Sequence, residues 1–95
     1  MITHIVLLRP KSEVAVDEIA TVLDHVRGLQ KDIPGIVETQ AGENRSPNNQ
    51  GYAYGFVMHF VDAEHLKAYA PHPAHQVVSK ELQAMCESII DFDIE

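Results

Sequence analysis

The first segment of the chain constrains the fold most, because both of its faces are apolar. Residues 1–9 are mostly β-prone side chains that alternate between two faces. One face carries Ile2, His4, Val6 and Leu8, and the other carries Thr3, Ile5 and Leu7. Such a strand must be covered on both sides. A domain of 95 residues leaves much of its surface in contact with water. A sheet that is apolar on both faces therefore has to bury one of them against another subunit.

The next segments predict a long helix followed by a β-hairpin. Apolar residues recur at helical spacing over residues 13–31, and Pro34-Gly35 ends that pattern. Residues 36–42 and 52–61 then have strand character, and the loop between them, residues 43–51, is rich in Asn, Ser, Pro and Gly. We therefore expect the two strands to pair across this loop.

The last third of the chain predicts two helices and a closing strand. Asp62 is the expected N-cap of a short helix that ends at Tyr69. A second long helix starts near Pro73, since proline is favoured at the first helical position. In the closing strand Ile90, Phe92 and Ile94 alternate with acidic residues.

The order of these elements, β-α-β-β-α-β, predicts one α+β domain over residues 1–95 with a ferredoxin-like arrangement. Both long helices then cover one face of a four-stranded antiparallel sheet. The other face carries Ile5, Leu7 and Val57, and stacking two sheets face to face would bury it in a homodimer. We expect the apolar face of the closing strand to join this interface. Asp91 would then reach the helix-side cavity, where it can pair with an imidazole.

Charge and cysteine content narrow the function classes. Seven Lys and Arg against 14 Asp and Glu give a net charge of -7, which would repel a nucleic-acid backbone. One cysteine, Cys86, cannot form an intrachain disulfide, and we expect it to be a buried, inert thiol within the second long helix. With no apolar leader pattern, we expect a cytoplasmic protein without membrane contact. The glycines form no phosphate loop or dinucleotide fingerprint, so no cofactor is expected.

The segment Tyr69-Ala70-Pro71-His72-Pro73-Ala74-His75 is the most informative for chemistry. Its two prolines stiffen a corner between a Tyr at one helix end and a His in the first turn of the next helix. A phenol and an imidazole held there can act as hydrogen-bond donor and general base on one substrate. Alternatively, His72 and His75 merely cap the corner by bonding to the backbone. A metal site of His72, His75 and His4 is a weaker alternative, because Pro73 places His72 outside the helix.

Further polar residues are expected near this corner. His4 lies on the first strand's helix-side face, and Tyr54 lies on the aromatic face of the third strand. Each can also be a core residue with a satisfied polar atom. Together with Tyr69 and His75 they have the profile of a small-molecule pocket, in which few polar groups are framed by apolar ones. The residues that we expect to contact a ligand besides the catalytic pair are His4, Tyr54, Val6, Leu23, Val26 and Asp91.

At this point the chain resembles the stress-responsive dimeric α/β-barrel (Dabb) domain family. The segments that carry the resemblance are residues 2–8, Ile33-Pro34-Gly35, Gly51-Tyr52, His72-Pro73-Ala74-His75 and Asp91-Phe92-Asp93. The resemblance implies a ferredoxin-like protomer that dimerises through its sheets. It also implies a catalytic role for Tyr69 and His75. In one plant member the matching pair closes a linear poly-β-ketone into an aromatic ring without a cofactor.

The resemblance extends to one further histidine of that plant enzyme but not to its whole pocket. Its first-strand His matches His4, whereas its third-strand His is replaced by Tyr54. Its first-helix aromatic residues are replaced by Val22, Leu23 and Val26.

The expected function is that of a cofactor-independent lyase, cyclase or isomerase acting on a polyketide-like or aromatic carbonyl compound. His75 would remove a proton next to the carbonyl group, and Tyr69 would donate to the developing enolate oxygen. Two alternatives use the same pocket. One is a non-catalytic dimer that binds a ligand or contributes to stress tolerance, and the other is a cofactor-free oxygenase.

Overall fold

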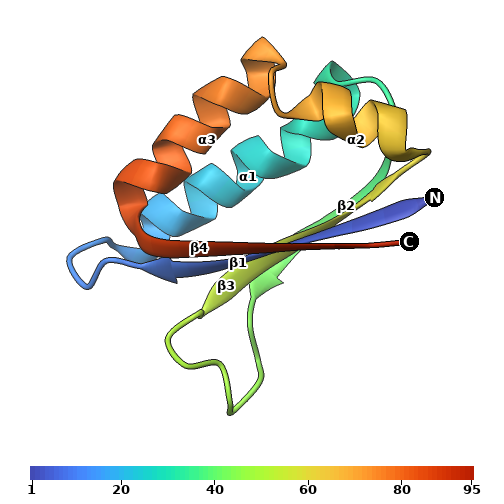
Figure 1. Cartoon of the computed structure of the whole chain (residues 1–95). Helices are drawn as coiled ribbons and strands as arrows, with labels where there is room; N and C mark the ends of the chain where they lie inside the picture. Colours follow the sequence, from blue (N-terminus) through green and yellow to red (C-terminus); the bar gives the residue numbers. More distant parts are fainter.

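The computed structural model describes all 95 residues as a sheet covered by helices on one side (Figure 1). The strands are β1 (Ile2–Pro10), β2 (Ile36–Glu43), β3 (Tyr54–Phe60) and β4 (Cys86–Ile94). The helices are α1 (Val16–Asp32), α2 (Ala63–Tyr69) and α3 (Pro73–Met85). This element order confirms the ferredoxin-like arrangement, with α2 as the short additional helix.

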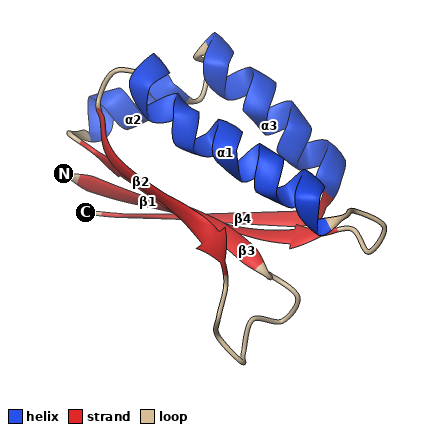
Figure 2. Ribbon diagram, turned by 180° about the vertical axis from the view of Figure 1, so that it is seen from behind, coloured by secondary structure: helices blue, strands red, loops and turns tan.

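The strands form one antiparallel sheet in the order β2-β3-β1-β4. β1 is central and pairs with β3 and β4, so that His4 lies between Met58 on one side and Asp93 on the other. All three helices lie on the same side of this sheet (Figure 2). The opposite side is left without a covering layer, as the two-faced first strand predicted.

The core fills the space between the sheet and the helices. It contains 17 buried residues, and the largest side chains that are fully buried are those of Phe60, Leu8, Met58, Val22 and Val26. They come from the inward face of β1 and β3 and from the apolar stripe of α1. The period-2 and helical patterns in the sequence therefore meet in one layer of packing.

Two elements start later than predicted because local hydrogen bonds compete with regular structure. The first helix starts at Val16, later than residue 13, and the Glu18 carboxylate accepts from the backbone N–H of Ala15 just before it. The third strand starts at Tyr54, because the backbone N–H of Tyr52 donates to the Asn49 carbonyl in the preceding turn.

The position predicted for Cys86 within the second long helix is wrong. Cys86 is the residue at which α3 ends, and it is the first residue of β4. The closing strand thus starts directly at the helix end, four residues before Ile90. The thiol is free and buried, and burial raises its pKa, so the expectation of a buried thiol holds at this junction.

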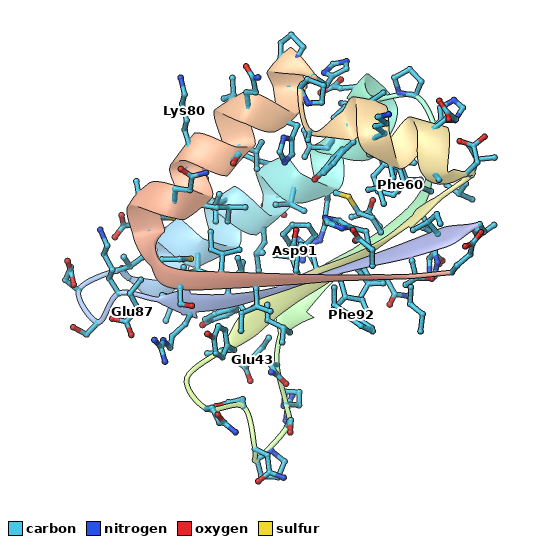
Figure 3. All side chains as sticks on the ribbon, viewed as in Figure 1. Glu43, Phe60, Lys80, Glu87, Asp91 and Phe92 are labelled. Carbon is cyan, nitrogen blue, oxygen red and sulfur yellow. The ribbon has the colours of Figure 1, made fainter.

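The uncovered face of the sheet carries an exposed apolar surface. Ile90, Phe92 and Ile94 have exposed fractions of 44%, 57% and 50%. Figure 3 shows Phe92 on the side of β4 away from the helices and Asp91 on the side toward them. Ile5 and Val57 face each other across β1 and β3 on the same uncovered side and are half-buried. No helix of the chain is both long and apolar enough to span a bilayer.

Candidate active site

A cavity of about 540 Å³ lies between the helices and the sheet, which is a size typical of small-molecule sites. Most of its lining side chains are apolar. It brings together six of the eight predicted site residues: Tyr69, His75, His4, Val6, Val26 and Asp91. These residues come from β1, α1, α2, α3 and β4, so the cavity depends on every layer of the fold.

The corner between α2 and α3 holds His75 in a defined state. The Nδ1 atom of His75 donates to the backbone carbonyl of Ala70 over 2.9 Å. Because a carbonyl only accepts, this bond places the ring proton on Nδ1 when the imidazole is neutral. No protein group bonds to Nε2, the second ring nitrogen, which is then an unprotonated acceptor.

The prolines explain why the Ala70 carbonyl is free for this bond. Three residues after Ala70 stands Pro73, which has no N–H to donate. The next N–H, that of Ala74, donates instead to Nδ1 of His72 over 3.1 Å. The ring of His75 thus supplies the donor that the backbone lacks. His72 is the N-cap of α3, which agrees with the capping role considered for it in the sequence. It does not line the cavity.

Tyr69 packs between the two cavity histidines. Its ring lies 4.2 Å from that of His75, 5.7 Å from that of His4 and 5.1 Å from that of Phe60, measured between centroids. The residue is only 4% exposed, and burial raises the pKa of its hydroxyl far above the ordinary value of 10.0. Burial is the sole cause of this rise, and no protein group accepts a hydrogen bond from the hydroxyl. The phenol therefore remains protonated and has an unused donor.

The second cavity imidazole is held by a carboxylate of β4. Nδ1 of His4 lies 2.5 Å from Oδ1 of Asp93, directly across the pairing of β1 with β4. His4 is only 7% exposed, whereas the Asp93 side chain is about half exposed. The expectation that Asp91 pairs with an imidazole is therefore wrong. Asp91 does line the cavity, but its register partner on β1 is Val6, so Asp93 makes the pair instead.

Two predicted ligand contacts lie outside the cavity. Leu23 is a buried core residue of α1, and Tyr54 is partly buried against the same core. Tyr54 pairs with Leu8, four residues along β1 from His4. At about 3.3 Å per residue this separates the two positions by about 13 Å. Tyr54 was correctly assigned to the helix-side face of β3. Its position along the strand, however, keeps its side chain out of the cavity.

The structure also reveals partners that the sequence did not predict. Nδ1 of His25 on α1 lies 3.0 Å from both carboxylate oxygens of Glu81 on α3. The two residues are 56 positions apart, and no local spacing signals such a pair. The three histidines considered for a metal site do not form a metal-binding cluster.

Comparisons with known proteins agree on the fold and the family. Residues 2–95 match the family described as Stress responsive A/B Barrel Domain (Dabb). A stress-response A/B barrel domain-containing protein of Arabidopsis thaliana is 27% identical over 93 residues, which cover 95% of this chain and 81% of that protein.

Solved structures have the same fold. A dimeric ferredoxin-like protein of unknown function from Jannaschia sp. CCS1 is 36% identical, with a TM-score of 0.87 and coverage of 99% of this chain and 97% of that one. A hydroxynitrile lyase from Passiflora edulis is 22% identical, with a TM-score of 0.89 and coverage of 98% and 90%. With a family match that spans nearly the whole sequence, the chain belongs to the stress-responsive A/B barrel (Dabb) family.

Proposed function

We propose that this protein is a cofactor-independent acid-base enzyme, a lyase, cyclase or isomerase, that acts on a small carbonyl compound in the cavity. The observation that carries the proposal is the state of His75. Its Nδ1–H is committed to the Ala70 carbonyl, so Nε2 is free to accept a proton. The donor hydroxyl of Tyr69 lies beside it, and both residues line an apolar cavity.

The proposed step is proton abstraction next to a carbonyl group. Nε2 of His75 takes the proton from carbon, and the electron pair moves onto the carbonyl oxygen to give an enolate. The Tyr69 hydroxyl donates a hydrogen bond to that oxygen, which lowers the energy of the developing charge. The enolate then attacks a second carbonyl, expels a leaving group or takes a proton back at another carbon. These three outcomes define a cyclase, a lyase and an isomerase.

Two further observations support a catalytic function for the cavity. The pair of His4 and Asp93 supplies a second oriented imidazole on the opposite wall, where it can hold the far end of a substrate. The fold is also shared with the hydroxynitrile lyase from Passiflora edulis, an enzyme whose name describes a lyase. That likeness indicates that this fold can carry lyase chemistry.

Turnover of a panel of β-diketones, lactones and β-hydroxyketones tests the proposal. His75→Ala should lower turnover by about 10² to 10⁴ fold, the range expected when a positioned base is lost. His25→Ala is the matched control, because it removes a histidine that bonds to Glu81 outside the cavity. Unchanged turnover in His75→Ala would contradict the assignment of the base. Binding of these compounds without turnover by the native protein would instead favour a ligand-binding dimer.

The assembly in which the cavity works is expected to be a homodimer. Solved relatives such as the Jannaschia protein are dimeric, and the uncovered sheet face of this chain exposes Phe92 at 57%. Phe92→Asp should shift the protein to monomers in sedimentation, because the carboxylate would be desolvated in the interface. Val77→Asp is the control, since Val77 is 64% exposed on α3, on the helix side. A Phe92→Asp protein that sediments as the native one would exclude this face.

A further inference from the structure

One carboxylate in the cavity has no partner in the protein. Asp91 and Asp93 of β4 both line the cavity, in register with Val6 and His4 of β1. Asp93 is bonded to His4, whereas no cation or donor of the chain lies within bonding distance of Asp91. Asp91 is an exposed residue of the cavity wall and its carboxylate has no partner in the protein, so a ligand in the cavity can bond to it.

Several of the other polar atoms of the cavity are bonded within the protein. Nδ1 of His75 is bonded to a carbonyl, and the hydroxyl of Ser79 accepts from the Gln83 amide over 3.0 Å. The groups left for a ligand are Nε2 of His75, the Tyr69 hydroxyl, Nε2 of His4, the Asp91 carboxylate and the ammonium of Lys67 on α2. The first two meet the carbonyl end in the proposed function. Asp91 belongs to β4, away from the corner that holds them.

The chemistry of Asp91 restricts what can lie against it. An ionised carboxylate only accepts hydrogen bonds, so a ligand group that meets it must be a donor. A second carboxylate at this place would be repelled. A cationic group would satisfy the charge, but the ammonium of Lys67 lines the same cavity and would repel it. A neutral hydroxyl group donates a hydrogen bond to the carboxylate and keeps the ligand uncharged.

We infer that the substrate is an uncharged hydroxy-carbonyl compound whose hydroxyl group donates to Asp91, and that Asp91 rejects analogues bearing a carboxylate at that position. The inference rests on the proposed function for the placement of the carbonyl end at His75 and Tyr69. Asp91 acts as a specificity-determining residue, because it contacts the end of the molecule that does not react.

Binding of three matched probes tests this inference without requiring turnover. The probes are acetophenone, 4-hydroxyacetophenone and 4-acetylbenzoate, which share one ring and one carbonyl and differ in the group that can meet Asp91. In titration calorimetry the native protein should bind the hydroxyl probe about three- to tenfold more tightly than acetophenone, and 4-acetylbenzoate most weakly.

Two substitutions of Asp91 assign the preference to its carboxylate. Asp91→Ala should abolish the preference for the hydroxyl probe and tighten the binding of 4-acetylbenzoate by at least about threefold. Asp91→Asn keeps an acceptor and removes the charge, so it should retain part of the first effect and show the second in full. Glu13→Gln removes one charge from an exposed loop position outside the cavity and should bind all three probes as the native protein does.

The outcomes separate this inference from the proposed function. Equal affinity of the native protein for acetophenone and its hydroxyl derivative overturns the role of Asp91, and so does a hydroxyl preference that survives in Asp91→Ala. Neither result depends on the base. The proposed function fails instead if His75→Ala retains turnover, whatever the probes show.

Discussion

Tyr69→Phe separates the structural from the chemical role of the residue at the centre of the cavity. The ring makes its contacts with His75, Phe60 and His4 through carbon, and phenylalanine keeps all three. The hydroxyl has no partner in the protein, so its removal leaves no donor or acceptor unpaired. The free energy of unfolding should therefore change by less than about 1 kcal/mol. Tyr69→Ala, which empties the space of the ring, should cost about 3 to 5 kcal/mol.

The assay is urea unfolding followed by circular dichroism, at one fixed protein concentration because a dimer gains stability with concentration. Turnover is measured on the same samples. Tyr69→Phe should lower turnover because the donor to the enolate oxygen is lost, although by less than His75→Ala, since the base remains. A loss of more than about 2 kcal/mol of stability in Tyr69→Phe would show that the hydroxyl holds the fold together and would refute this reasoning.

Two further predictions concern the helix caps near the cavity. His72→Ala should lower the free energy of unfolding by about 1 kcal/mol and leave turnover unchanged, because the ring caps α3 outside the cavity. His72→Asn supplies another capping side chain and should restore most of this loss in the same denaturation assay. Asp62 caps α2, and the side-chain hydrogen bond from His65 is the main cause that lowers its pKa below 3.8. The ionised Asp62 cap therefore stabilises the fold above pH 3.8, and this stabilisation is lost as the pH falls through the lowered pKa. The thermal midpoint of the native protein should thus fall more steeply in acid than that of Asp62→Ala.

Much of the fold could be predicted because the buried face of each strand and helix follows a repeating pattern of apolar residues along the chain. β1 showed two apolar faces and α1 one apolar stripe, and the two long helices could cover only one side of a sheet. The alternation of Ile90, Phe92 and Ile94 with acidic residues correctly placed the apolar side of β4 on the uncovered face. These features depend on neighbours along the chain, and a period of two or 3.6 residues records them.

The contacts within the site could be predicted only in part, because register is not visible in a single strand. Both Asp91 and Asp93 lie on the cavity side of β4, and the pairing of β4 with β1 decides which of them meets His4. A shift of two residues would have exchanged them without moving any apolar side chain to the wrong face. Tyr54 was misplaced for a related reason, since alternation fixes the face of a residue but not its position along the strand.

The position of β4 connects the assembly of the protein to the chemistry proposed for its cavity. β4 is an edge strand that pairs only with β1, and edge strands are held less firmly than central ones. Its outward side carries Phe92, which a partner sheet would cover, and its inward side carries Asp93, which orients His4. Covering Phe92 would restrain the strand and thereby the carboxylate on its other face. For this reason the uncovered sheet face and the cavity, although on opposite sides of the sheet, are expected to depend on each other through one strand.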